Sequence, residues 1–252
     1  MIFNMIKLEN LTKRYGPTHA VEALNLEVPD GELFGSIGPN GAGKTTTIRM
    51  IGGLLAPTSG KVIIDGVDIA ADPVGVKRKI GPIPDRPFLY EKLTGTEFLR
   101  FTADLFELNQ NEFLAKSKEL LNLFGLWDRA NELIEAYSHG MKQRLIMSAA
   151  LLHDPRLLIV DEPMVGLDPR GIKMVRNLFR RLAETGVTVF MSTHTLSLAE
   201  EICDRIGIIN NGKLIATGTI VELQSAARLG QANLEQAFLE LTQEQALEET
   251  NN

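Results

Sequence analysis

One short segment has the residue types and spacing of a phosphate-binding loop, G-x-x-x-x-G-K-S/T: Gly38, Pro39, Asn40, Gly41, Ala42, Gly43, Lys44 and Thr45. Glycines let the backbone turn with positive φ, so that successive N–H groups face one anion. We expect Lys44 to reach the β- and γ-phosphates of a nucleotide and the Thr45 hydroxyl to bind Mg²⁺. The alternative is an ordinary glycine-rich turn with a surface lysine.

Two carboxylates, Asp161 and Glu162, follow the apolar run from Leu157 to Val160. A continuous apolar run of this length is typical of a buried parallel strand. A carboxylate at the end of such a strand can hold Mg²⁺ directly or through water, and we assign this role to Asp161. Glu162 is placed to polarise an attacking water, which typically contributes about 10²–10⁴ in rate. Taken alone, the pair also fits a strand end with solvated acids.

A histidine, His194, ends a second apolar segment that begins at Thr188. A lone histidine after a strand is usually structural. In an open α/β sheet, however, parallel strands end at the edge where ligands bind. We therefore expect His194 to hydrogen-bond the γ-phosphate.

The elements around these residues combine parallel and antiparallel strands. The segment Glu32–Ile37 reads as a strand and Thr46–Ile51 as the start of a helix, so that the glycine loop joins strand to helix. Strands are also predicted over Met5–Leu11 and Ala23–Val28. Lys61–Ile64 precedes an Asp-Gly dipeptide, which is a strong hairpin signal. The N-terminal third is therefore expected to add antiparallel hairpins to a parallel core.

The middle of the chain is predicted to be helical. A capping box at Thr94–Glu97 precedes apolar residues at helical spacing, namely Phe98, Leu99, Phe101 and Leu105. A second amphipathic helix covers Glu112–Phe124, and Ser138 is the expected N-cap of a third. We expect a helical lobe from about Pro87 to Asp154. A further helix should begin after Asp168, and the tail should be helical with Leu234, Phe238 and Leu241 on one side.

The stretch from Tyr137 to Arg144 reads Tyr-Ser-His-Gly-Met-Lys-Gln-Arg. It resembles the signature of the ATP-binding-cassette (ABC) ATPases, Leu-Ser-Gly-Gly-Gln, and is close to a Ser-x-Gly-Met-Lys-Gln-Arg form found in one branch of exporters. The order of the motifs also fits: phosphate loop, helical lobe, signature, Asp-Glu strand, Gly166-Leu167-Asp168 and His194. The resemblance covers about residues 5 to 220.

The resemblance implies an α/β fold with a P-loop NTPase core, a mainly parallel sheet, an N-terminal antiparallel β subdomain and an inserted all-helical subdomain. We expect a single ABC ATPase domain over residues 1–252. Residues 1–86 and 155–218 would form the nucleotide-binding core, 87–154 the helical signature subdomain and 219–252 a helical tail.

The resemblance also implies a composite ATP site with Mg²⁺ as cofactor. Within one chain it implies an adenine stacked on Tyr15, whose alternative is an exposed turn tyrosine, and a phosphate site of Gly38–Thr45 extended by Thr46. The signature contacts the γ-phosphate held by a second subunit. The residues expected to act across the dimer are Ser138, His139, Gly140, Met141 and Asp168.

Four residues depart from the family pattern. Asp85 stands where the family usually has a glutamine. A carboxylate is a good ligand for Mg²⁺ but donates no hydrogen bond, so we expect Asp85 to act through Mg²⁺ or its waters. His139 replaces a glycine of the signature, and Met164 and Val165 replace a threonine and a serine. The catalytic set Lys44, Glu162 and His194 is intact.

Composition bounds the partners. The chain has 252 residues, 44% hydrophobic and 23% charged, with a net charge of −6. Its acidic pI of about 5.4 argues against a general nucleic-acid partner. The single cysteine, Cys203, cannot form an internal disulfide and is expected to be a buried apolar residue in a reducing compartment. No signal peptide and no long apolar run is apparent.

The expected function is the ATP-binding and ATP-hydrolysing subunit of an ABC transporter, and the resemblance to that branch favours an exporter. Such a subunit works as a dimer, with integral membrane permease subunits, on the cytoplasmic face of the membrane. The permeases would dock near Phe88-Leu89-Tyr90, although packing within the lobe explains these side chains equally well. Two alternatives remain: a soluble, non-transport ATPase of the same fold, and an ATP-binding regulatory module with weak turnover.

Overall fold

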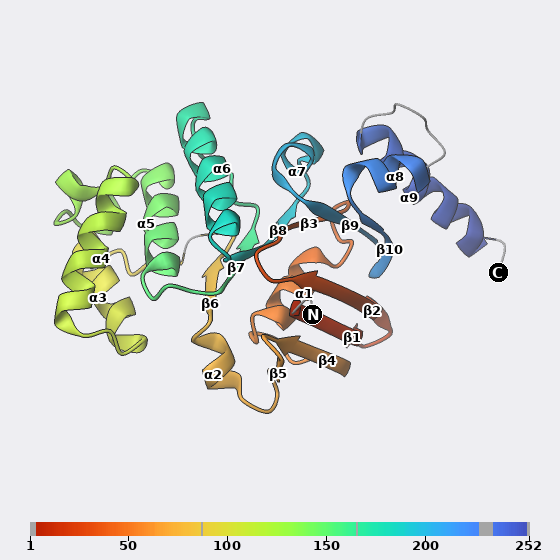
Figure 1. Ribbon diagram of the computed structural model, residues 1–252, viewed down its shortest axis with the longest axis horizontal. Helices are drawn as coiled ribbons and strands as arrows, with labels where there is room; N and C mark the ends of the chain where they lie inside the picture. Colours follow the sequence, from red (N-terminus) through yellow and green to blue (C-terminus); the bar gives the residue numbers. More distant parts are fainter. Residues whose placement is uncertain (1–3, 87, 165, 227–233, 251–252) are drawn as a thin grey trace.

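A computed structural model describes residues 4–86, 88–164, 166–226 and 234–250, which form two β-sheets surrounded by helices (Figure 1). The strands are β1 (Asn4–Tyr15), β2 (Thr18–Pro29), β3 (Leu33–Ile37), β4 (Ser59–Ile64), β5 (Val67–Asp68), β6 (Ile80–Ile83), β7 (Leu157–Asp161), β8 (Thr188–Thr193), β9 (Arg205–Asn210) and β10 (Lys213–Gly218). The helices are α1 (Lys44–Ile51), α2 (Pro73–Lys77), α3 (Gly95–Leu105), α4 (Gln110–Leu123), α5 (His139–Leu151), α6 (Pro169–Glu184), α7 (Leu196–Ile202), α8 (Ile220–Ala226) and α9 (Leu234–Thr250), with the 3₁₀ turns η1 (Trp127–Arg129) and η2 (Ile134–Ala136).

The larger sheet has the strand order β10-β9-β3-β8-β7-β6 and is parallel except for the antiparallel pair β9 and β10. All residues of β3, β7 and β8 are buried, because helices or the second sheet cover both faces. The prediction of a mainly parallel sheet is confirmed. The edge strand β6 was not predicted, since it is short and contains Pro82, a residue tolerated mainly at sheet edges.

The smaller sheet has the order β2-β1-β4-β5, with every pair antiparallel. The hairpin predicted at Asp65-Gly66 joins β4 to β5, and both residues have positive φ (50° and 76°) as a tight hairpin turn requires. Helix α1 lies between the two sheets, where Ile48, Met50 and Ile51 are buried in the same apolar cluster as residues of both sheets. This sandwich fixes the start of α1 relative to the strand ends.

Between β6 and β7, the described residues form helices and turns, with an isolated bridge between Thr94 and Leu133, at one end of the molecule in Figure 1. Thr94 and Glu97 form the predicted capping box of α3. The helix predicted from the spacing of Phe98, Leu99, Phe101 and Leu105 is present. Phe98 and Leu99 pack inward, whereas Phe101 and Leu105 remain 42% and 64% exposed. Helix α3 packs on α4 and α5, and Phe98 and Leu99 belong to the same apolar cluster as residues of these two helices.

The C-terminal helices α8 and α9 pack on each other and on β10, and Leu234 is fully buried. Cys203 is buried as expected, and its burial raises the pKa of the thiol. Among the described residues, no helix has the length and apolar character needed to cross a membrane.

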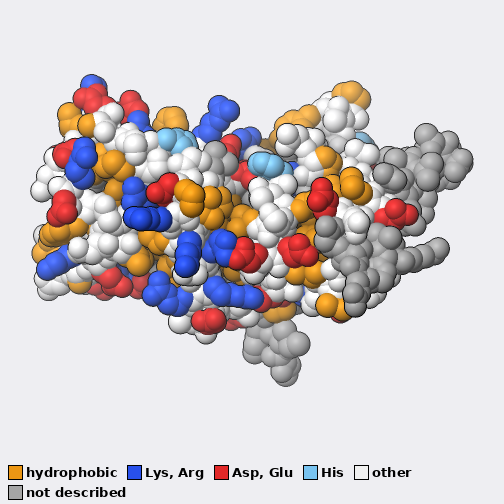
Figure 2. All heavy atoms as spheres, turned by 90° about the horizontal axis from the view of Figure 1, so that it is seen from above, with side chains coloured by type: hydrophobic (Ala, Val, Ile, Leu, Met, Phe, Trp, Pro, Cys, Tyr) orange, Lys and Arg blue, Asp and Glu red, His pale blue; other side chains and the backbone are white. Residues whose placement is uncertain are grey.

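The face of the molecule in Figure 2 carries Lys and Arg side chains interspersed with Asp and Glu. Helix α6 is rich in arginine, and within the described part of the chain Arg176 pairs with Glu201 and Arg180 with Asp204. These pairs reduce the positive field that a nucleic acid would require. That the chain has no nucleic-acid partner stays a prediction.

Candidate functional site

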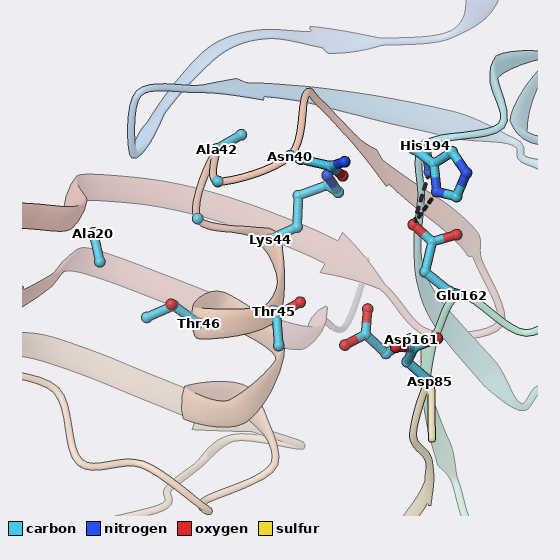
Figure 3. Close-up of a pocket in the computed structure, with 12 residues that line it drawn as sticks. Ala20, Asn40, Ala42, Lys44, Thr45, Thr46, Asp85, Asp161, Glu162 and His194 are labelled. Carbon is cyan, nitrogen blue, oxygen red and sulfur yellow. Dashed lines mark hydrogen bonds and ion pairs between the residues drawn. The ribbon is translucent and has the colours of Figure 1, made fainter. Parts of the chain in front are cut away.

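A hollow of about 360 Å³ opens at the edge where the central parallel strands end. Its lining comes from β2, the loop after β3, the start of α1, the ends of β7 and β8 and the segment after β6: Ala20, Asn40, Gly41, Ala42, Gly43, Lys44, Thr45, Thr46, Asp85, Asp161, Glu162 and His194. Figure 3 shows Lys44 and Thr45 on one side, facing Asp85, Asp161, Glu162 and His194 on the other. The structure therefore brings together in one place residues that the sequence holds about 150 positions apart.

The glycines of the loop have steric reasons to be glycine. A Cβ on Gly38 would lie 2.1 Å from the carbonyl oxygen of Ile209, and one on Gly43 would lie 2.4 Å from that of Ala20. Gly41 and Gly43 also have positive φ (83° and 106°). Gly43 precedes α1 without any side-chain cap, so the first N–H groups of α1 have no capping partner. Such a helix N-terminus suits an anion.

Lys44 is 8% exposed, and its ammonium group donates hydrogen bonds to the carbonyl oxygens of Gly38 (2.7 Å) and Pro39 (3.0 Å). Burial lowers the pKa of Lys44, while the nearby carboxylates of Glu162 and Asp161 oppose this change. A phosphate entering the hollow would replace these neutral carbonyl acceptors with anionic oxygens, which bind an ammonium more strongly.

Three oxygen-bearing side chains, Thr45, Asp85 and Asp161, line this hollow and also an adjoining one of about 440 Å³. Hydroxyl and carboxylate oxygens are the hard donors that Mg²⁺ prefers, together with waters and phosphate oxygens. No group of three or more His, Cys, Asp or Glu side chains suited to a metal occurs among the described residues. The protein thus offers a partial set of Mg²⁺ ligands, which fits a metal that a nucleotide phosphate completes.

Glu162 is held by three contacts from the end of β8. Its Oε1 accepts a hydrogen bond from the backbone N–H of His194 (2.9 Å) and lies 2.8 Å from His194 Nδ1. Its Oε2 accepts from the hydroxyl of Thr193 (3.2 Å). The backbone of Glu162 has φ of 49°, a left-handed conformation that is uncommon for this residue type and turns its side chain away from the strand direction.

Tyr15, predicted to stack on adenine, is 51% exposed at the end of β1 and does not line the hollow. The ammonium of Lys13 lies 5.5 Å from its ring centroid. Its exposed ring is free to meet a flat ligand that extends out of the hollow, so its role stays a prediction.

The residues expected to act across a dimer lie at a different place. Ser138 caps α5 by accepting a hydrogen bond from the N–H of Met141 (3.3 Å), and Asp168 caps α6 by accepting from Gly171 (2.8 Å). A hollow of about 600 Å³ between these caps is lined by Ser138, His139, Gly140, Arg144, Gly166, Leu167, Asp168, Arg170, Gly171 and Met174. It shares no lining residue with the hollow of about 360 Å³ around Lys44, which we call the phosphate hollow. Val165, one of the departures noted above, lies outside the described residues.

Two residues that contact the carboxylates were missed by the sequence interpretation. The hydroxyl of Ser192 donates a hydrogen bond to Asp161, and that of Thr193 donates to Glu162. A signal for them exists, because hydroxyl residues are unusual at the end of an otherwise apolar strand such as β8.

Comparisons with known proteins agree with this geometry. A family model described as ABC transporter matches residues 21–165. The linearmycin resistance ATP-binding protein LnrL of Bacillus subtilis is 42% identical, covering 90% of this chain and 72% of that protein. The bacitracin transport ATP-binding protein BcrA of Bacillus licheniformis is 44% identical over 84% of this chain and 68% of its own length. The daunorubicin/doxorubicin resistance ATP-binding protein DrrA of Streptomyces peucetius is 40% identical, covering 88% of this chain and 67% of that protein.

Solved structures show the same fold. A structure described as the ATP-binding subunit of an ABC transporter superposes with a TM-score of 0.90 at 35% identity, covering 94% of this chain and 99% of that one. A dimeric, post-hydrolysis structure of the cassette MJ0796 with ADP and Pi superposes with a TM-score of 0.78 at 28% identity, covering 85% and 98%.

Proposed function

The chain belongs to the ABC transporter family of ATP-binding proteins, and on that premise we propose that it is the nucleotide-binding subunit of an exporter whose membrane subunits are separate chains. As a member of this family it binds and hydrolyses ATP to drive transport. The observation that carries the assignment to these residues is the meeting of Lys44, Asp161, Glu162 and His194 at one hollow.

Within one chain, the loop Gly38–Thr45 and Thr46 would hold the phosphates of ATP through backbone N–H groups and the ammonium of Lys44. Tyr15 would receive the adenine. Thr45, Asp161 and Asp85 would hold Mg²⁺, directly or through its waters. When bound there, the metal would neutralise charge on the β- and γ-phosphates.

Glu162 would act as the general base for the attacking water, because it is the carboxylate that lies nearest to His194 and is fixed at both oxygens. His194 would meet the γ-phosphate through the ring nitrogen that is not directed at Glu162. This arrangement keeps the base and the phosphate contact on neighbouring strand ends.

The separation of the two hollows supports a site completed by a second ATPase chain, identical or different. Ser138, His139, Gly140, Met141 and Asp168 would supply the contacts across that dimer. Each γ-phosphate would then bind both chains and favour the closed form, and hydrolysis would remove that link. In this proposal residues 1–86 and 155–218 act as the nucleotide core, 87–154 as the signature subdomain and 219–252 as the tail.

Exposed apolar side chains mark where the permease subunits would dock. Phe88 is 84% exposed and Tyr90, which packs edge-on against Phe101, is 53% exposed. Leu54, also well exposed, lines the adjoining hollow together with Asp85 and Arg86. Asp85 thus faces both the docking surface and the phosphate hollow, which would let docking influence hydrolysis. The chain would lie peripherally on the cytoplasmic face of the membrane.

The names of the relatives support export. Two of those described above are named for resistance to linearmycin or to daunorubicin and doxorubicin, and one for bacitracin transport. We infer outward transport of a small molecule. Cargo selection would belong to the membrane subunits.

The direct test is co-expression with the candidate permease, purification of the complex in detergent and measurement of phosphate release. We expect a complex that contains two ATPase chains, identical or different, and that hydrolyses ATP in a reaction dependent on Mg²⁺. If the chain binds no polytopic membrane protein, and if it hydrolyses ATP at the same rate with and without the candidate permease, the soluble ATPase is favoured. Binding of ATP without turnover in the complex would favour the regulatory module.

A further inference from the structure

Three adjacent strands of the larger sheet carry polar residues at one level. In the parallel register, Ser192 of β8 lies opposite Asp161 of β7 and, on its other side, opposite Ser36 of β3. All three are buried, with exposed fractions of 0%, 8% and 1%. Polar side chains in a sheet covered on both faces lose hydration, and a hydrogen bond between two of them offsets part of that cost.

The hydroxyl groups at the end of β8 divide between the two carboxylates. Ser192 donates to Asp161 Oδ1, and the next residue, Thr193, donates to Glu162 Oε2 at 3.2 Å. Successive residues of a strand point to opposite faces, and the left-handed turn at Glu162 brings its carboxylate back toward Thr193. The end of β8 therefore contacts both carboxylates, Asp161 through the hydroxyl of Ser192 and Glu162 through the hydroxyl of Thr193.

We propose that Ser192 and Thr193 are positioning residues with separate tasks: Ser192 orients the carboxylate that holds Mg²⁺, and Thr193 orients the carboxylate that acts on water. This inference rests on the roles proposed above for Asp161 and Glu162. Neither hydroxyl lines the phosphate hollow, so neither touches the substrate directly.

The physical basis is the restriction of rotation. A carboxylate with one oxygen bonded to a buried hydroxyl keeps the other oxygen directed at the hollow, whereas a free carboxylate samples other orientations and loses part of its metal affinity. Partners of this kind typically change metal affinity about 10–100-fold when removed. For a general base, a displacement on the order of 1 Å can cost about 10²-fold in rate.

The first test compares Ser192→Ala with Ser36→Ala. Both variants remove a buried hydroxyl at the same level of the sheet, but Ser36 has no hydrogen-bond partner among the described residues. We expect Ser192→Ala to raise the Mg²⁺ concentration for half-maximal ATP hydrolysis by about tenfold or more. It should also reduce the gain in ATP affinity that Mg²⁺ produces in equilibrium binding. Ser36→Ala should change neither quantity, and Ser192→Thr, which keeps the hydroxyl, should restore most of both.

The second test compares Thr193→Val with Thr188→Val on the same strand. Thr188 is fully buried at the opposite end of β8, where its hydroxyl bonds Pro29 and Gly31. We expect Thr193→Val to lower kcat by about tenfold without changing ATP affinity or the Mg²⁺ requirement. Thr193→Ser should recover most of kcat, while Thr188→Val should affect the melting temperature alone.

If folded Ser192→Ala and wild-type protein show the same dependence of ATP hydrolysis on Mg²⁺, the role proposed for Ser192 is wrong. If kcat is unchanged in Thr193→Val, the role proposed for Thr193 is wrong. Should Ser192→Ala not fold, Ser192→Cys keeps the shape of the side chain with a slightly larger atom and a weaker donor, and must show the same direction of change. If wild-type protein in its complex does not hydrolyse ATP, the proposed function itself fails. The two failures are therefore separate observations.

Discussion

The imidazole ring of His139 occupies the place that a side chain on Gly166 would need. A Cβ built on Gly166 would lie 1.9 Å from His139 Cδ2 and 2.5 Å from Nε2. Gly166 also has φ of 78°, which favours glycine. The first residue of α5 thereby contacts the segment that leads into α6, so the two elements proposed to face a second subunit touch within one chain.

This contact predicts that substitutions at His139 and Gly166 have non-additive effects on the free energy of unfolding. Gly166→Ala should destabilise the fold through both the collision and the positive φ, by roughly 2 kcal/mol. In the double variant His139→Gly/Gly166→Ala the collision is absent and only the backbone cost remains. Urea unfolding of the four proteins should give a coupling free energy of about 1 kcal/mol or more. Additive effects would mean that the ring simply moves aside.

Replacement of the proposed base, Glu162→Gln, should reduce ATP turnover by about 10²–10⁴ while leaving ATP binding intact. The amide oxygen of glutamine can still accept the hydrogen bond from the His194 backbone, so the local geometry is preserved. Because ATP persists, the variant should accumulate as an ATP-bound dimer. Phosphate release and light scattering with ATP measure the two effects, and hydrolysis near the wild-type rate would exclude Glu162 as the base.

Motifs and caps were predictable because they depend on neighbours in the sequence. The glycine loop, the hairpin at Asp65-Gly66 and the caps at Ser138 and Asp168 each require only a few adjacent residues, and the structure contains all of these elements. Edge strand β6 lacks such a local signal, since four residues with a proline do not form a periodic pattern.

The contacts to the carboxylates could not be predicted in this way. Ser192 meets Asp161 only because β7 and β8 pair in one particular parallel register, which is set by packing of residues far apart in the chain. The exposure of Phe101 likewise depends on which helices cover α3, and not on its spacing within the helix. Local pattern therefore identified the chemically active residues, whereas their supporting contacts required the fold.

Removal of the loop ammonium in Lys44→Ala should weaken ATP binding by about tenfold or more, since hydrogen bonds to charged groups contribute roughly 1.5–3 kcal/mol each. Part of that gain is offset in the wild type, because Lys44 must first leave the carbonyls of Gly38 and Pro39. Lys61→Ala, at an exposed position of β4, removes the same charge outside the hollow and serves as the control. Equal affinity of the two variants in a nucleotide titration would contradict the assignment.

A half-buried histidine, His153, should make the stability of the fold depend on pH. His153 stacks on Phe106 with ring centroids 3.6 Å apart, and its Nε2 lies 3.1 Å from the carbonyl oxygen of Ile80. Burial lowers the pKa of His153 to about 4, although the contact with Ile80 opposes this and Lys116 adds to it. In the unfolded chain His153 takes up a proton near pH 6.5, whereas in the folded chain the His153 side chain remains neutral until about pH 4.

Folding stability from this group is therefore complete above about pH 6.5 and is lost as the pH falls toward 4, by roughly 1–2 kcal/mol between pH 7 and pH 5. His153→Gln keeps a donor for Ile80 and removes the titration. We expect the variant to be less stable than wild type at pH 7, because it lacks the ring stacked on Phe106, and the difference in unfolding free energy to narrow by that amount at pH 5. Urea unfolding at the two pH values measures it, and a difference that stays constant would show that His153 does not resist protonation in the folded state.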